Sequence, residues 1–177
     1  WDDILKRIIR LKKDNYDGLK ELAKNVKNGV TDVNTIYKRE EIGDFSTEFL
    51  DNNIESWKDK WDINFGGDLA QQKFVSPSKY IFLLNYARVY KDEEVFNHVK
   101  KTLDIISNSG LNDFIEGGFY RYTVDSEWKI PHFEKMLYDQ AQMISMYSQA
   151  YKLYKDEHYK EIVIETINFL NLKMSSK

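Results

Sequence analysis

The sequence predicts an all-α protein built from helical hairpins that form part of an α/α toroid. Helical hydrophobic periodicity runs through most of the 177 residues, and only two prolines interrupt it. Segments that are apolar nearly all round alternate with segments that carry one apolar stripe, which is the pattern expected of inner and outer helices. The sequence also repeats across these pairs of segments.

The N-terminal part is predicted to contain three helices. The first spans residues 3–13, and the second spans residues 16–26 and ends at Gly29, a typical C-terminal stop. Residues 29–45 are polar and are expected to be irregular. Ser46 can then cap a third helix, whose apolar face carries Phe49, Leu50, Ile54 and Trp57.

Two helical hairpins follow in the second half. Ser76 and Pro77 form a cap and first turn for an inner helix that ends at Tyr90, and residues 92–108 give a striped outer helix. Residues 132–154 and 156–172 repeat this order of inner and outer helix. A ring of six such pairs needs about a dozen helices of ordinary length. The chain has about half of them, so we expect an arc whose last inner surface is open.

Two sequence echoes support the repeat. Tyr90-Lys91-Asp92-Glu93 returns 64 residues later as Tyr154-Lys155-Asp156-Glu157. Asp62 and the pair Gly66-Gly67 return 51 residues later as Asp113 and Gly117-Gly118. Each unit therefore consists of an Asp-x-x-x-Gly-Gly loop, an inner helix, a tight turn and an outer helix.

Composition excludes several classes of function. The net charge of −3 gives no broad attraction to nucleic acid, and no apolar run reaches the roughly 20 residues of a membrane span. The absence of cysteine excludes disulfides and thiolate metal sites, and the three histidines lack metal-ligand spacing. We therefore expect no cofactor, metal, nucleic acid or membrane partner. A cytoplasmic location is expected, although the cysteine content does not reveal the compartment. Self-association through the open toroid edge is a candidate interaction.

The functional face is predicted at the long connection from Ser109 to Pro131. Loops beyond about 12–15 residues are uncommon and are usually functional or disordered. This connection contains four aromatic residues, which argues against disorder: Phe119, Tyr120, Tyr122 and Trp128. It also leads to the expected N-terminus of an inner helix, so charged groups would gather there.

The run from Gly117 to Asp125, then Trp128, then Pro131 to Gln140 closely resembles the signature of the YyaL-type thioredoxin-domain proteins. This family includes the spermatogenesis-associated thioredoxin-domain proteins of animals. The resemblance implies a thioredoxin-like domain followed by a six-hairpin toroid that is similar to sugar epimerases and glycosidases. It assigns residues 1–28 to linker helices after an absent thioredoxin-like domain, and residues 29–177 to part of the toroid. The loop after Gly67 departs from the family pattern and keeps only Lys73-Phe74 and the later Pro77-Ser78, so no family role is carried over to it.

Three candidate catalytic residues follow from this run. His132, at the expected start of the inner helix, could act as a base, because a helix N-terminus disfavours the charged ring, or it could simply pack the helix end. Glu134 could pair with Asp139 or Asp125 for glycoside chemistry, which requires two carboxyl groups about 5–9 Å apart, or it could serve only the helix dipole. Lys135 and Asp139 have the spacing of a helical ion pair.

Five further residues are candidates for binding. Arg121 could clamp a carboxylate or phosphate, or it could pin the loop to Asp125. Tyr122 and Trp128 could stack on a sugar or form the core of the loop. Tyr138 completes the predicted set with Asp125. Two hypotheses remain open: a carbohydrate-binding toroid with epimerase-like or hydrolase-like chemistry, and a non-catalytic scaffold in which the loop only locks helix pairs together.

Overall fold

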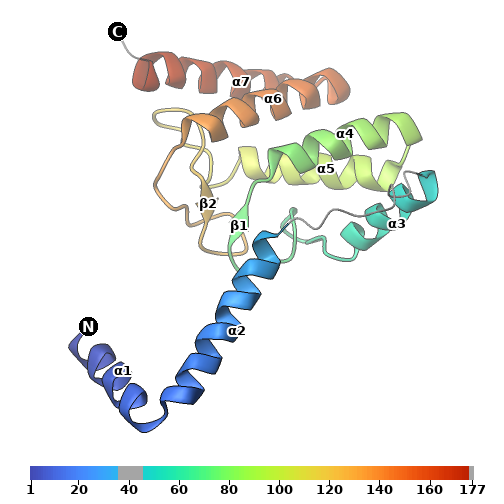
Figure 1. Cartoon of the computed structure of the whole chain (residues 1–177). Coiled ribbons are helices and arrows are strands. Elements are labelled where there is room, and N and C mark those ends of the chain that lie inside the picture. The colour runs from blue at the N-terminus through green and yellow to red at the C-terminus, as the bar shows by residue number, and fades with distance from the viewer. Residues whose placement is uncertain (36–45, 176–177) are drawn as a thin grey trace. The chain divides into compact units, whose positions relative to one another are not determined.

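The computed structural model describes residues 1–35 and 46–175 (Figure 1). The chain divides into two compact units, Trp1–Ser46 and Thr47–Lys177. The predicted domain boundary between residues 28 and 29 lies inside a helix of the first unit. The assignment of residues 1–28 to a linker after a thioredoxin-like domain stays a prediction.

The first unit contains α1 (Asp2–Asp14) and α2 (Tyr16–Asn34), joined at Asn15. The side chain of Asn15 caps α2 by accepting a hydrogen bond from the N–H of Gly18, at 3.0 Å. The helix continues past Gly29, so the predicted stop and the irregular segment from residue 29 to 34 are wrong. A glycine inside a helix costs about 1 kcal/mol but does not end it unless the backbone turns left-handed. Residues 36–45 of that predicted segment lie outside the described residues.

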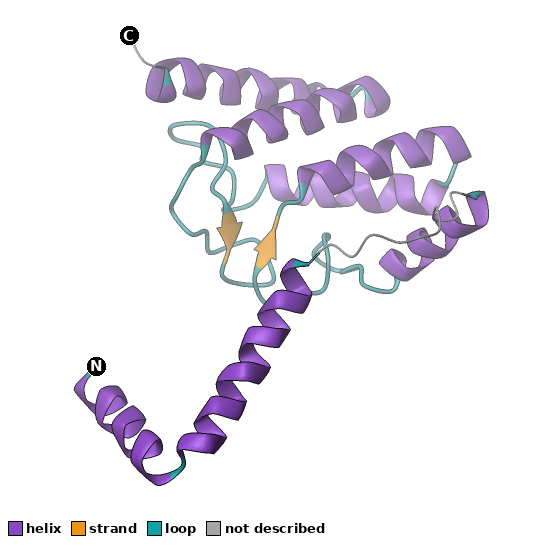
Figure 2. Cartoon of the chain, viewed as in Figure 1, coloured by secondary structure: helices purple, strands orange, loops and turns teal. Residues whose placement is uncertain are grey.

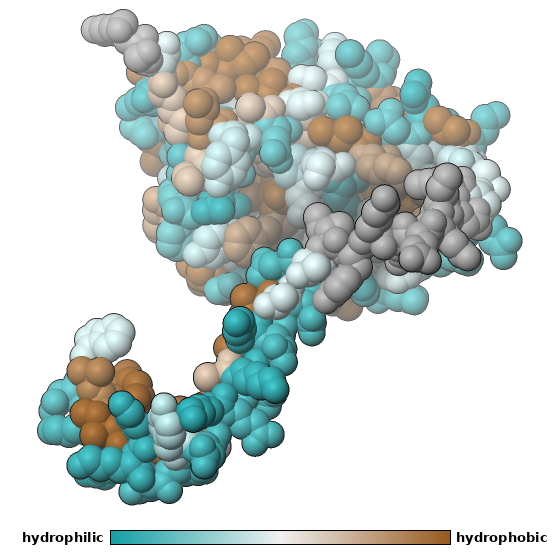
Figure 3. Space-filling model, in the orientation of Figure 1, coloured by the Kyte–Doolittle hydropathy of each residue, from teal (hydrophilic) through white to brown (hydrophobic). Residues whose placement is uncertain are grey.

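Apolar side chains on α1 are exposed, as Figure 3 shows for the N-terminal helix. The exposed set comprises Ile4, Leu5, Ile8, Ile9 and Leu11. Neither helix of the first unit buries a residue.

The regular secondary structure described in the second unit is helical apart from one short ribbon, and loops connect these elements (Figure 2). Its helices are α3 (Thr47–Lys58), α4 (Pro77–Tyr90), α5 (Glu93–Ser107), α6 (Leu137–Tyr154) and α7 (Glu157–Phe169), and a π-helical turn, Leu170–Met174, ends it. The strands β1 (Lys73–Phe74) and β2 (Tyr122–Thr123) pair antiparallel, with Lys73 opposite Thr123. The ribbon thus joins the loops that precede α4 and α6.

Two hairpins, α4/α5 and α6/α7, pack against each other through α4 and α6. The predicted inner and outer helices are therefore confirmed. The outer helix α5 buries a continuous stripe of Val95, Val99, Leu103 and Ile106. The inner helix α4 is not buried all round, because Val89 and Tyr90 near its C-terminus remain exposed.

The repeated turns between inner and outer helices have the same geometry. Lys91 and Lys155 both adopt the left-handed conformation, with φ of 55° and 56°. Asp92 and Asp156 then cap α5 and α7 by accepting backbone N–H hydrogen bonds of 3.0 and 3.1 Å. At the start of α4, Pro77 occupies the first turn as predicted, but the Ser76 side chain makes no capping hydrogen bond.

The inner helix α6 begins at Leu137, so the predicted start at residue 132 is wrong. Residues before it are held in an extended path by β2. Pro131 bridges to Thr123, the N–H of His132 donates to Tyr122 O at 2.8 Å, and Glu134 O accepts from the N–H of Arg121 at 3.0 Å. Backbone groups engaged in this way cannot also form helical hydrogen bonds.

Candidate functional site

The site rests on two Asp-x-x-x-Gly-Gly loops with the same internal structure. In the first, Asp62 accepts hydrogen bonds from the N–H groups of Asn64 and Phe65, both at 2.9 Å. The ammonium of Lys73 closes the loop by donating to the Asp62 carboxylate at 2.6 Å and to Gly66 O at 2.7 Å. Both side chains of this ion pair are buried.

The second loop repeats this arrangement. Asp113 accepts from the N–H groups of Ile115 and Glu116, at 2.9 and 3.1 Å. Lys135 donates to the Asp113 carboxylate at 2.6 Å and to Gly117 O at 2.8 Å. The predicted pairing of Lys135 with Asp139 is therefore wrong, because residues before 137 are not helical and the two side chains do not share a helix face.

A lysine ammonium faces the aspartate in each loop, at 2.6 Å in both. Burial alone raises the pKa of the Asp62 and Asp113 carboxyl groups. The lysine ammonium and the backbone N–H donors outweigh this effect, so the net pKa of each carboxyl group lies below its usual value of 3.8. The loops are therefore fixed by charge, and the second one anchors the segment that carries the candidate residues.

A close approach at Gly118 fixes the start of α6 relative to the second loop. Gly118 has φ of +77°, and a Cβ there would lie 2.8 Å from the ring of Phe169. The buried side chain of Gln140, in the first turn of α6, donates to Phe119 O at 2.7 Å and accepts from the Phe119 N–H at 2.8 Å. Asp139 precedes Gln140, so this contact positions it at the rim of the helix pair.

Four predicted residues meet beside the first turn of α6, and we call Arg121, His132, Glu134 and Asp139 the rim cluster. The Arg121 guanidinium lies 3.4 Å from the Glu134 carboxylate and 3.9 Å from the Asp139 carboxylate. His132 Nδ1 lies 3.5 Å from the same Glu134 oxygen. The side chains of Arg121 and Glu134 are 39% and 34% exposed, so they pair with each other but still reach solvent.

Aromatic rings flank the rim cluster. The Tyr122 ring is stacked between His132, at 4.8 Å, and Phe74, at 4.5 Å between ring centroids. The Arg121 guanidinium lies 5.9 Å from the centre of the Tyr138 ring, and Tyr138 is half exposed. The cluster thus combines charge with aromatic surface.

Asp139 has the most perturbed environment in the cluster. Burial raises the pKa of its carboxyl group, and the Glu134 carboxylate adds to this effect, while Arg121 opposes it. Its Oδ2 atom is buried and accepts no hydrogen bond from the described residues. It lines a small cavity with Arg121, Pro77 and Met143, where the first turns of α4 and α6 meet. A carboxyl group in such a place holds its proton more strongly than a solvated one.

The helix-dipole argument for His132 and Glu134 fails, because both residues precede α6. Asp139 is the acidic residue in the first turn of that helix. Its dipole therefore acts on Asp139 and not on the histidine.

Two predicted binding residues lie outside the cluster. Trp128 is 1% exposed, and its indole N–H donates to Phe65 O at 2.9 Å, so its ring packs between the two loops. The Asp125 carboxylate accepts three backbone N–H groups within its own loop, from Glu127, Lys129 and Ile130. Arg121 does not pin the loop to Asp125, because its ion pairs are made with the rim cluster.

The roles of the loop lysines Lys73 and Lys135 and of Gln140 were not predicted from the sequence. The Asp-x-x-x-Gly-Gly echo located both loops, but the lysine follows its aspartate at different spacings, as Lys73 after Asp62 and Lys135 after Asp113. No fixed motif could therefore reveal the ion pairs. Among residues 1–35 and 46–175, no group of three or more acidic or histidine side chains could hold a metal ion, and no helix is long and apolar enough to cross a membrane.

Comparison with known proteins places these features in context. No family model matches the chain. Human spermatogenesis-associated protein 20 is 34% identical over 121 residues, which cover 66% of this chain and 15% of that protein. The Caenorhabditis elegans uncharacterized protein B0495.5 is 36% identical over 123 residues, 66% of this chain and 17% of that protein. The chain thus matches only about one sixth of the length of these relatives.

A solved structure supports the fold. Cellobiose 2-epimerase from Spirochaeta thermophila superposes with a TM-score of 0.61 at 16% sequence identity, over 71% of this chain and 37% of that one. At this identity the similarity concerns the fold alone, and it confirms the predicted α/α toroid architecture.

Proposed function

The chain belongs to the family of spermatogenesis-associated protein 20, and we propose that its toroid arc carries an acid–base site for a carbohydrate at the rim cluster. One observation carries the proposal. Arg121, His132, Glu134 and Asp139 converge, partly exposed, beside the first turn of an inner helix. The similarity of the fold to a cellobiose 2-epimerase suggests a sugar as the ligand class.

The chemical roles follow from the contacts. Asp139, whose carboxyl pKa is raised by burial, is the proton donor. His132 is the proton acceptor, and Glu134 orients it through the 3.5 Å contact with Nδ1. In an epimerisation next to a carbonyl group, the base removes the proton on carbon and an acid returns a proton to the opposite face, so the reaction consumes nothing.

Ligand binding falls to the neighbouring groups. Arg121 can donate to sugar oxygens from its half-exposed guanidinium. The half-exposed ring of Tyr138 offers a face on which a sugar ring can stack. A hydrolase would use the same residues differently, with Asp139 protonating the leaving oxygen and Glu134 as the second carboxylate.

A scaffold role is the second candidate, and one observation favours it. Arg121 and Glu134 are joined by a backbone hydrogen bond of 3.0 Å as well as by their side chains. Such a double link would hold the extended segment against β2 without any ligand.

The full-length protein should be tested against neutral mono- and disaccharides. Calorimetry measures binding, and nuclear magnetic resonance in deuterated water measures exchange of the proton next to the carbonyl group. We expect His132→Gln and Asp139→Asn to lower the exchange rate at least about a hundredfold while the fold is retained. Glu165→Gln on the outer helix α7 is the matched control and should leave the rate unchanged.

Two results would count against the proposal. Absence of sugar binding at millimolar concentration would remove it, as would binding that the rim variants do not alter. If Arg121→Ala and Glu134→Gln instead lower the melting temperature without changing any ligand signal, the scaffold role is favoured.

A further inference from the structure

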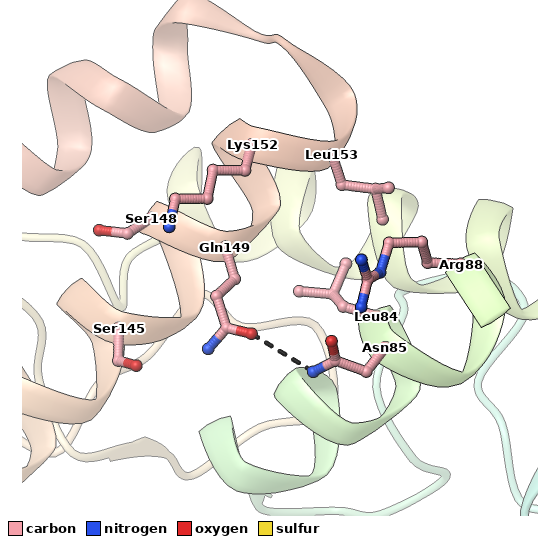
Figure 4. Close-up of a pocket in the computed structure, with 8 residues that line it drawn as sticks. All are labelled: Leu84, Asn85, Arg88, Ser145, Ser148, Gln149, Lys152 and Leu153. Carbon is pink, nitrogen blue, oxygen red and sulfur yellow. Dashed lines mark hydrogen bonds between the residues drawn. The ribbon is translucent and has the colours of Figure 1, made fainter.

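A second concave site lies between the inner helices α4 and α6. Its volume is about 590 Å³, within the range of sites for small molecules. Its lining comes from the C-terminal half of α4 and the middle and end of α6, including Leu84, Arg88, Gln149 and Lys152 (Figure 4). The rim cluster lies at the opposite end of the same two helices, so the two sites share no residue.

The charged side chains that line this groove are both positive. Arg88 and Lys152 are its charged lining residues, and each extends from a different helix. No carboxylate of the described residues lies within ion-pair distance of either one. Cations in the last turn of a helix do offset its dipole. Offsetting the helix dipole does not require Arg88 and Lys152 to border the same groove. Because neither cation is paired with a carboxylate of the described residues, the groove has a net positive potential that a ligand can meet.

Neutral hydrogen-bonding groups line the rest of the groove. Asn85 donates to the side-chain oxygen of Gln149 across the groove at 3.4 Å, a long and replaceable hydrogen bond. Ser148 adds a hydroxyl, and the buried Leu84 contributes apolar surface. Such a lining matches a body that carries several hydroxyl groups.

We propose that this groove binds an anionic, polyhydroxylated small molecule, such as a phosphorylated or carboxylated sugar. Its anionic group contacts Arg88 and Lys152. Its hydroxyl groups exchange hydrogen bonds with Asn85, Gln149 and Ser148. This inference does not depend on the function of the rim cluster, because it rests on other residues and on the positive charge of Arg88 and Lys152.

The test is a titration of the full-length protein with glucose 6-phosphate, glucuronate, inorganic phosphate and neutral glucose, followed by calorimetry. We expect the anionic sugars to bind at least about tenfold more tightly than glucose, which corresponds to about 1.4 kcal/mol. Arg88→Gln and Lys152→Gln should each weaken the binding of the anionic sugars. Lys160→Gln, which removes one positive charge from the outer helix α7, is the matched control and should not.

Further arms separate the sources of binding. Gln149→Ala should weaken the binding of glucose 6-phosphate but leave the binding of inorganic phosphate unchanged. This difference would identify the contacts to the sugar hydroxyl groups. His132→Gln should change the binding of neither ligand. A negative result for this groove can therefore be told apart from a negative result for the rim cluster.

Three results would overturn the inference. One is equal affinity for glucose and the anionic sugars. Another is an equal loss of affinity in Lys160→Gln, which would indicate non-specific charge attraction. The third is a change of oligomeric state in Arg88→Gln seen by sedimentation, because a second copy of the chain would then occupy the groove.

Discussion

Replacement of Asp62 by asparagine isolates the charge of the first loop. The asparagine oxygen can still accept the N–H groups of Asn64 and Phe65, so the turn keeps its backbone hydrogen bonds. What is lost is the carboxylate 2.6 Å from the Lys73 ammonium. The side chain of Lys73 is 1% exposed and that of Asp62 is 7% exposed, so solvent cannot replace the lost partner.

The expected cost is about 3–5 kcal/mol of unfolding free energy, the range found when one member of a buried ion pair is removed. Domains of ordinary stability have about 5–15 kcal/mol in total, so this loss is large. Urea unfolding followed by circular dichroism measures it. The double variant Asp62→Asn/Lys73→Met should recover part of the loss, because no unpaired buried charge remains.

Lys160→Met supplies the control on an exposed pair. Lys160 and Glu157 are both more than half exposed, and we expect no measurable change in stability. If Asp62→Asn costs less than about 1 kcal/mol, its pair with Lys73 behaves like an exposed pair, and the reasoning from burial is refuted.

Three further predictions concern stability. Gly118→Ala should lower the free energy of unfolding by roughly 2–4 kcal/mol, measured by urea unfolding, because φ is +77° and Phe169 blocks the new methyl group. Gly29→Ala is the control: a Cβ there would have nothing within 4 Å, so it should not destabilise the chain. The free energy of unfolding should fall as the pH drops below about 4, because Asp62 and Asp113 have lowered pKa values in the folded chain and the unfolded chain therefore binds more protons. A free energy of unfolding that does not change with acid would contradict this. The carboxyl pKa of Asp139 is raised, so the stability that its protonated form contributes is lost as the pH rises above 3.8. We therefore expect the Asp139→Asn variant to melt no lower than the unaltered chain at pH 7. A lower melting temperature would contradict the assigned environment of Asp139.

Short-range signals in the sequence determined most of the helices and the repeat. The apolar stripe of α5 lies where periodicity predicted it, and the two tight turns lie at the repeated segments that contain Asp92 and Asp156. These features depend on neighbours three or four residues apart, which a sequence displays directly. The charged and aromatic residues around Arg121 were also predicted as the candidate site.

The use of those residues depends on contacts that the sequence does not display. Backbone contacts of Pro131, His132 and Glu134 with residues 121–123 keep this segment out of the helix. The helix α6 therefore starts at Leu137, and Lys135 pairs with Asp113 instead of Asp139. Trp128 became part of the core, while Asp139 became a partly exposed residue of the rim cluster with one buried carboxylate oxygen. The physical reason is that burial and charge depend on contacts between segments far apart in the chain, and local periodicity does not encode which segments meet.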